Sequence, residues 1–278
     1  MSPPGTRQST GTSAFSPPAS SAGLASASAS ASASTGTISD ALHRLRSAQK
    51  KTPGAPGYSR YVNRPIGRYL AAMAYRLGLG PNQVTGLSGA FSFVGIALIA
   101  LVRPAWWSAA AVCGCLVLGY ALDSADGQLA RLRGGGSRVG EWFDHMVDVT
   151  KISCLHLAVL ISVYRFDRAS DAYLLVPLVY AVAANVWFFG IMLMDQLRRR
   201  DGRPPAGTIA DARPGLRALL VLPTDYGVVC LMFALLATPA FRGVYAFFAA
   251  FNVCFTLASV YRWNRELRRA DVDAATPP

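Results

Sequence analysis

The sequence predicts an all-α integral membrane protein with six transmembrane helices and a preceding interfacial amphipathic helix. Of its 278 residues, 52% are hydrophobic and only 15% are charged, whereas a soluble domain carries about a quarter charged residues. Long apolar runs alternate with short loops that contain arginine. The net charge of +12 would suggest nucleic acid as a partner of a soluble protein. In a chain with these apolar runs it indicates a lipid membrane instead, and no nucleic acid.

Four segments follow from composition. Residues 1–36 are rich in Ser, Ala, Thr, Pro and Gly, and such a segment buries too little apolar surface to fold, so we expect a disordered low-complexity tail. Residues 37–57 contain LHRLRSAQKK, a basic amphipathic or linker segment. Residues 58–270 form the predicted six-helix domain, and residues 271–278 a second disordered tail.

The helical domain begins with VNRPIGRYLAAMAYRLGLG, which is apolar on one face and carries interspersed arginines. This pattern predicts the interfacial helix. Six runs of about 18–22 residues, the length that crosses a bilayer as a helix, follow it. These predicted spans are residues 84–101, 105–122, 146–164, 172–194, 219–239 and 243–262.

Arginine content predicts the orientation of the spans. The loops after the second and fourth spans and both flanks of the domain are rich in arginine, whereas the other connections hold few uncompensated ones. Because Lys and Arg gather on the cytoplasmic side, we expect a multi-pass cell (inner or plasma) membrane protein. Both termini and the connection between the second and third spans are then cytoplasmic.

That connection contains DSADGQLARLRGGGSRVGEWFDHMVD, in which four aspartates occur as two pairs. On a helix, Asp123 and Asp126 lie about 60° apart, and Asp144 and Asp148 about 40° apart. The first pair ends one span and the second begins the next, so four carboxylates should converge. Carboxylates this close repel one another unless cations compensate them. Oxygen ligands suit hard divalent ions, so we expect two Mg²⁺ or Mn²⁺ ions.

The residues between the aspartates are suited to phosphate chemistry. Gly127, Ala130 and Gly140 leave room beside the carboxylates, and the Arg131 guanidinium matches phosphate oxygens. His145 points about 100° away from Asp144 on a helix, so we expect it to face solvent or another helix rather than a metal.

These residues match the signature D-x2-D-G-x2-A-R-x8-G-x3-D-x3-D at every position, and the chain thereby resembles the class I CDP-alcohol phosphatidyltransferase family. The segment PNQVT, at residues 81–85, resembles the family's segment before its first helix. The resemblance covers the chain from about residue 58.

The resemblance implies metal-dependent transfer of a phosphoalcohol group, such as phosphatidyl, from CDP-diacylglycerol or another CDP-alcohol to an acceptor hydroxyl. CMP is released, and the reaction belongs to phospholipid biosynthesis. A homodimer is also implied. The implied metal ligands are Asp123, Asp126, Asp144 and Asp148, with Asp148 also the general base. The implied CDP-binding residues are Asn82, Thr85, Gly127, Ala130, Arg131 and Gly140.

The sequence does not identify the acceptor alcohol. Four polar residues near the site are candidates for binding it: Lys151, Asn185, Arg198 and Asp225. Lys151 has an alternative role as the partner of a carboxylate, and Arg198 as a cytoplasmic anchor of its span. Asp225 belongs to the segment PTDY at residues 223–226, whose Thr224 and Tyr226 are further candidates and whose Pro223 interrupts a helix.

Three other functions are open to a chain of this kind. An intramembrane prenyltransferase also uses aspartate pairs on a diphosphate, but its two acidic motifs would lie in separate halves of the chain. A cation transporter would carry carboxylates near the bilayer midplane and a repeated half. An inactive family member would lack a metal aspartate, and none is missing here.

Overall fold

We examined a computed structural model, which describes residues 42–43, 45, 57–167, 171–204 and 222–275. The predicted tail at residues 1–36, most of the segment at 37–57 and part of the predicted fifth span lie outside these residues. The regular elements of the described part are all helical, as expected. A short π-helix, η1 (Ser59–Asn63), leads into α2 (Arg64–Arg76).

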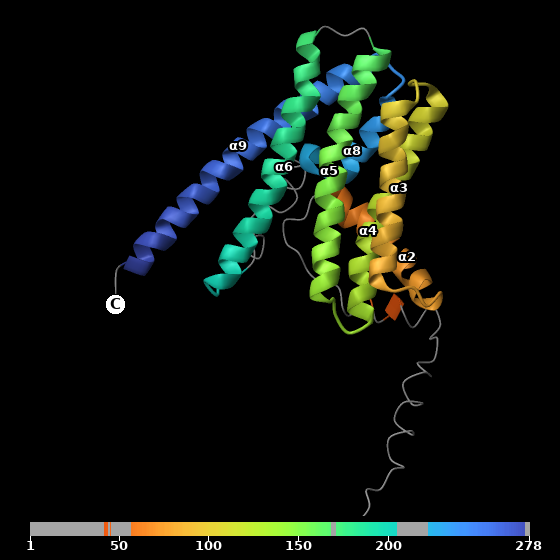
Figure 1. Ribbon diagram of the computed structural model, residues 1–278. Coiled ribbons are helices and arrows are strands. Elements are labelled where there is room, and N and C mark those ends of the chain that lie inside the picture. Colours follow the sequence, from red (N-terminus) through yellow and green to blue (C-terminus); the bar gives the residue numbers. More distant parts are fainter. Residues whose placement is uncertain (1–41, 44, 46–56, 168–170, 205–221, 276–278) are drawn as a thin grey trace, which may run out of the picture. The chain divides into compact units, whose positions relative to one another are not determined.

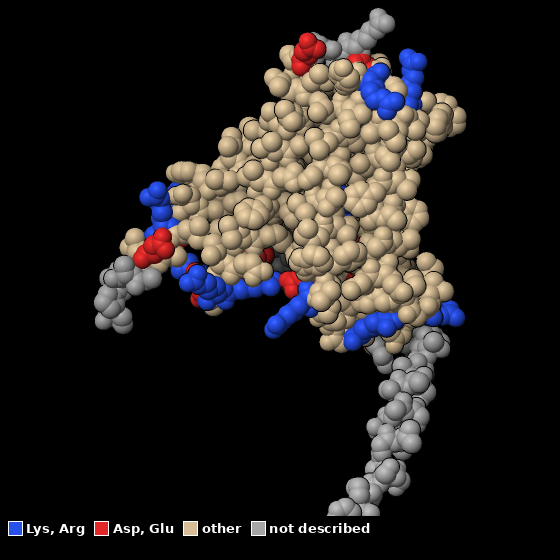
Figure 2. Space-filling model, viewed as in Figure 1, with Lys and Arg blue, Asp and Glu red and all other residues tan. Residues whose placement is uncertain are grey.

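Five helices are long and apolar enough to cross a membrane. They are α3 (Pro81–Leu101), α4 (Trp106–Leu132), α5 (Arg138–Phe166), α6 (Asp171–Arg200) and α9 (Ala240–Ala275). On the face drawn in Figure 2, Lys, Arg, Asp and Glu gather at the two ends of these helices and are scarce in the middle. Such a band fits a hydrocarbon environment.

The predicted fifth span is not confirmed as a crossing helix. Its described part consists of η2 (Leu222–Thr224), α8 (Tyr226–Met232) and η3 (Phe233–Leu235). The helical run from Tyr226 to Leu235 is about 15 Å long, half the hydrocarbon thickness. Pro223 and the Asp225 cap start this run late, so six spans remain a prediction.

Several helices extend beyond the predicted spans. The apolar run of α4 ends near Leu122 but the helix continues to Leu132, and α5 begins at Arg138, ahead of its apolar run. Ser137 caps α5 by accepting a hydrogen bond from the Gly140 amide at 3.0 Å. Asp123, Asp126 and Asp144 therefore lie on helical extensions, and Asp148 lies just inside the predicted third span. Helix α9 runs to Ala275, past the predicted domain boundary at residue 270.

Helix α3 organises the part of the bundle that holds the aspartates. It packs against both α4 and α5, while α4 and α5 are not among the closely packed helix pairs of the described residues. The three stand side by side in Figure 1, and α6 packs on α5 and α9 on α6. Gly134 and Gly135 turn the chain between α4 and α5 at φ of 94° and 131°, values that favour glycine. The signature residues thus face a space between two helices.

Helix α2 forms at the predicted position and packs on α4. Its buried residues are small, among them Gly67, Ala71 and Ala74, whereas Tyr69 and Met73 are exposed. This distribution suits a helix lying on a membrane surface, but that placement is still a prediction. Leu45, from the predicted basic segment, is buried in an apolar cluster with Ala71 and Leu129.

Candidate active site

Two cavities meet at the aspartates. The first, which we call the signature cavity, has a volume of about 770 Å³ and lies among the start of α3, the end of α4 and the start of α5. All six predicted CDP-binding residues line it, together with two of the aspartates: Asn82, Thr85, Asp126, Gly127, Ala130, Arg131, Gly140 and Asp144. Asn82 and Asp144, which are 62 positions apart in the sequence, thus line the same cavity.

Local contacts explain why these residues suit the signature cavity. The Thr85 hydroxyl donates a 2.6 Å hydrogen bond to Asp126 Oδ2, which joins α3 to α4. A Cβ at Gly140 would lie 2.9 Å from Asn82 Oδ1, so glycine permits this close approach of α5 to α3. A Cβ at Gly127 would have only the Arg131 guanidinium nearby, at 3.7 Å. Packing therefore does not require glycine at 127, and the space beside it is open to a ligand.

The second cavity, which we call the aromatic cavity, has a volume of about 210 Å³ and lies among α4, α5, α6, α8 and α9. Asp123, Asp148 and Lys151 line one part of it. Six of its other lining residues are aromatic: Tyr120, His156, Tyr180, Trp187, Phe188 and Tyr226. Each pair of signature aspartates thus has one member in each cavity.

The aspartates converge, but not as one tight set. Asp123, Asp126 and Asp144 line a further cavity of about 290 Å³ beside α2. The Lys151 ammonium lies 2.7 Å from both Asp123 Oδ1 and Asp148 Oδ1, and thereby links α4 to α5. An ammonium that fits between two carboxylates shows that one cation can serve both helices. The Asp144 Oδ1 atom is buried without a hydrogen-bond partner among the described residues.

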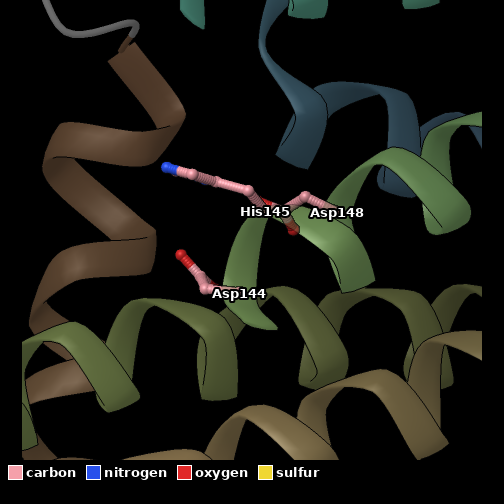
Figure 3. Close-up of side chains that lie close together, drawn as sticks. All are labelled: Asp144, His145 and Asp148. Carbon is pink, nitrogen blue, oxygen red and sulfur yellow. The ribbon is translucent and has the colours of Figure 1, made fainter. Parts of the chain in front are cut away.

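These features fit hard divalent cations. The donors are carboxylate oxygens from two helices, and Asp144 Oδ1 has a buried, unsatisfied acceptor position. Among the described residues, one group of three has ligand atoms within 4.8 Å of one another, namely Asp144, His145 and Asp148 (Figure 3).

His145 departs in part from its predicted position. Its ring does face another helix, with an edge-on contact to Phe188 of α6 at 6.4 Å between centroids. It also lies close to the two carboxylates of its own helix, and its Nδ1 atom is buried without a partner among the described residues. The 100° separation from Asp144 does not decide the position of His145, because Asp148 follows three residues later and lies only about 60° from it on the helix.

Of the four candidate acceptor residues, Lys151 alone lines the aromatic cavity. Arg198 forms a bidentate pair with Glu266 of α9, at 2.8 and 2.7 Å. Asn185 accepts a 2.9 Å hydrogen bond from the Ser153 hydroxyl. Asp225 is 1% exposed and accepts hydrogen bonds from the amides of Ser59 and Gly227, at 2.9 and 3.1 Å. An acceptor role for these last three residues would require them to exchange existing partners.

Thr224 and Tyr226, from the PTDY segment noted among the acceptor candidates, do line the aromatic cavity. The rest of its aromatic lining was not predicted. His156 and Tyr180 lie within apolar runs, and nothing in their spacing distinguishes them from packing residues.

The chain belongs to the CDP-alcohol phosphatidyltransferase family, whose model matches residues 79–258. It is therefore a membrane-embedded transferase of phospholipid biosynthesis, as the signature predicted. No match to a curated protein was found.

Among solved structures, the chain is similar to phosphatidylinositol phosphate synthase (PgsA1) of Mycobacterium tuberculosis. Its crystal structure with manganese and citrate is 21% identical, with a TM-score of 0.49, and the match covers 73% of this chain and 88% of that one. The structure with CDP-DAG bound is 22% identical, with a TM-score of 0.48 and coverage of 73% and 93%. The apo form is 23% identical, with a TM-score of 0.44 and coverage of 69% and 94%.

Proposed function

We propose that this protein transfers a phosphatidyl group from CDP-diacylglycerol to the hydroxyl of an acceptor alcohol and releases CMP. The observation that carries the proposal is the signature cavity, in which the six predicted CDP-binding residues are brought together beside Asp126 and Asp144. A diphosphate bound there would lie next to the carboxylates and within reach of the Arg131 guanidinium.

The proposed reaction forms one bond and breaks one. The acceptor hydroxyl oxygen attacks the phosphorus that carries the diacylglycerol, and the bond from this phosphorus to the bridging oxygen of the diphosphate breaks. CMP leaves with that electron pair. The hydroxyl proton passes to the carboxylate of Asp148, which borders the aromatic cavity and is held by Lys151 at 2.7 Å.

Four residues would hold two divalent cations, Mg²⁺ or Mn²⁺: Asp123, Asp126, Asp144 and Asp148. Bound there, the cations would supply charge neutralisation for the diphosphate and for the departing CMP. Thr85 fixes the Asp126 carboxylate through its hydrogen bond, so the ligand set is partly preorganised. We place the active site on the cytoplasmic side of a cell membrane, where a nucleotide headgroup from solution and acyl chains from the bilayer can meet.

Substitution of Asp148 tests the proposal. Purified protein with Mn²⁺ and CDP-diacylglycerol should release CMP when the acceptor is supplied, and Asp148→Asn should lower this rate by about 10²–10⁴-fold. Asp273→Asn, at an exposed position near the end of α9, is the matched control and should retain full activity. CMP release by Asp148→Asn at the unsubstituted rate would exclude Asp148 as the base.

A further inference from the structure

The aromatic cavity is placed to hold the second substrate. It borders Asp123 and Asp148, whereas Asp126 and Asp144 border the signature cavity. A donor in the signature cavity and an alcohol in the aromatic cavity would therefore meet at the aspartates. At about 210 Å³ the aromatic cavity is smaller than the pockets of about 300–1,000 Å³ that hold larger ligands. This volume suits a small molecule.

The charge of the aromatic cavity disfavours a phosphorylated occupant. Among its described lining residues, Lys151 is the one Lys or Arg, and its ammonium already contacts two carboxylates at 2.7 Å each. Arg198 is occupied by Glu266. A phosphate ester bound here would be desolvated without pairing with a basic side chain among the described lining residues. Burying an uncompensated charge is costly.

Neutral polar groups, among them Asn252, Tyr180 and His156, line part of the cavity. The Asn252 amide donates to the Tyr180 hydroxyl at 3.0 Å and to two carbonyl oxygens. The His156 ring stacks on Tyr180 and its Nδ1 lies 2.9 Å from the Tyr245 hydroxyl. These groups hold one another in place and form a polar wall inside the membrane domain.

Tyr226 differs from this wall in the surroundings of its hydroxyl. Among the described residues the oxygen is buried without an oxygen or nitrogen partner, the weakly bonding Cys230 thiol lies nearby, and the side chain lines the aromatic cavity. Its ring is held edge-on against Tyr120, with 5.2 Å between centroids. A buried hydroxyl without a partner is uncommon, because losing its hydrogen bond to water costs about 1–3 kcal/mol. A ligand hydroxyl in the cavity would satisfy it.

We propose that the aromatic cavity binds an uncharged polyhydroxyl alcohol as the acceptor, and that the Tyr226 hydroxyl hydrogen-bonds to it. This inference rests on the proposed function. One hydroxyl of the polyol faces Asp148 and reacts, while another engages Tyr226. The aromatic rings pack against the C–H faces of the same molecule. Tyr226 is thus a specificity-determining residue for the acceptor, separate from the residues that bind CDP.

Paired acceptors test the substrate class. CMP release from CDP-diacylglycerol with Mn²⁺ is measured with myo-inositol, glycerol, the phosphate ester of each, L-serine and choline. An uncharged polyol should be used at least 10-fold more efficiently, by kcat/KM, than its phosphate ester. Preference for a phosphate ester, serine or choline would overturn the inference and leave the proposed function intact. Absence of CMP release with every acceptor would contradict both.

Tyr226→Phe tests the residue. It should raise the KM for the preferred polyol about 3- to 10-fold, the effect of one lost hydrogen bond. The KM for CDP-diacylglycerol and the calorimetric affinity for CDP with Mn²⁺ should stay unchanged, which also shows that the variant is folded. Tyr164→Phe is the matched control. Tyr164 is exposed and lies at the end of α5 that is remote from the aspartates. An unchanged acceptor KM in Tyr226→Phe would refute the role of Tyr226.

Discussion

The signature cavity and the aromatic cavity share the aspartates but differ in how they are built. The signature cavity is lined by residues that follow one another along α4 and α5, with a few from the start of α3. The aromatic cavity takes its lining from helices spread between Tyr120 and Asn252. If the signature cavity holds the donor, as we propose, a short signature of fixed spacing suffices to build that site. The proposed acceptor site is instead lined by residues whose positions follow from packing between distant helices.

Removal of the Lys151 ammonium, which lies between Asp123 and Asp148, should have the largest effect. Lys151→Met would leave the Asp123 and Asp148 carboxylates without their shared partner, and breaking a buried pair in this way costs about 3–5 kcal/mol. Because both carboxylates are about a fifth to a quarter exposed, we expect the lower end of that range. Thermal unfolding in detergent would measure it.

The same variant separates two roles of the aspartates. If they bind divalent cations, Mn²⁺ should raise the unfolding temperature of Lys151→Met more than that of the unsubstituted protein, because the added cation replaces the lost charge. An equal shift in the two proteins would argue that these two carboxylates serve Lys151 alone.

An intermediate effect is expected in the signature cavity. Gly140→Ala places a Cβ 2.9 Å from Asn82 Oδ1 and so displaces the Asn82 side chain, which lines the signature cavity. The KM for CDP-diacylglycerol should rise about 10-fold, equivalent to about 1.4 kcal/mol, while the acceptor KM stays constant. Gly114→Ala, where a Cβ meets no atom within 4 Å, is the control. A change confined to the acceptor KM would mean that the two cavities are not independent.

The smallest effect is expected beside the aromatic cavity. Asp225→Ala removes the cap of α8 and the acceptor of the Ser59 amide, and loss of a helix cap costs about 0.5–2 kcal/mol. The chemical-denaturation midpoint should fall accordingly while relative rates with different acceptors do not change. Altered acceptor preference would instead restore Asp225 as an acceptor-binding residue.

Most of the helices could be predicted from the sequence. Hydrophobic runs identified the five long helices, since each contains a span-length apolar run, and the spacing of the aspartates placed both pairs on helices. The run at residues 219–239 is not confirmed as a full crossing helix. Its composition is apolar, but Pro223 and Asp225 delay the helix, and composition does not report that.

By itself, the sequence determined the family, the helical class and the residues of the signature cavity, because these depend on residue types at short, fixed spacings. Only the tertiary structure showed that Lys151 joins Asp123 to Asp148, that Asp225 caps a helix, and that Tyr226 lines the cavity beside Asp123 and Asp148. Each of these depends on which side chains meet across α4, α5, α6, α8 and α9. Contacts between segments that are distant in the sequence produce no short-range sequence pattern from which they could be predicted.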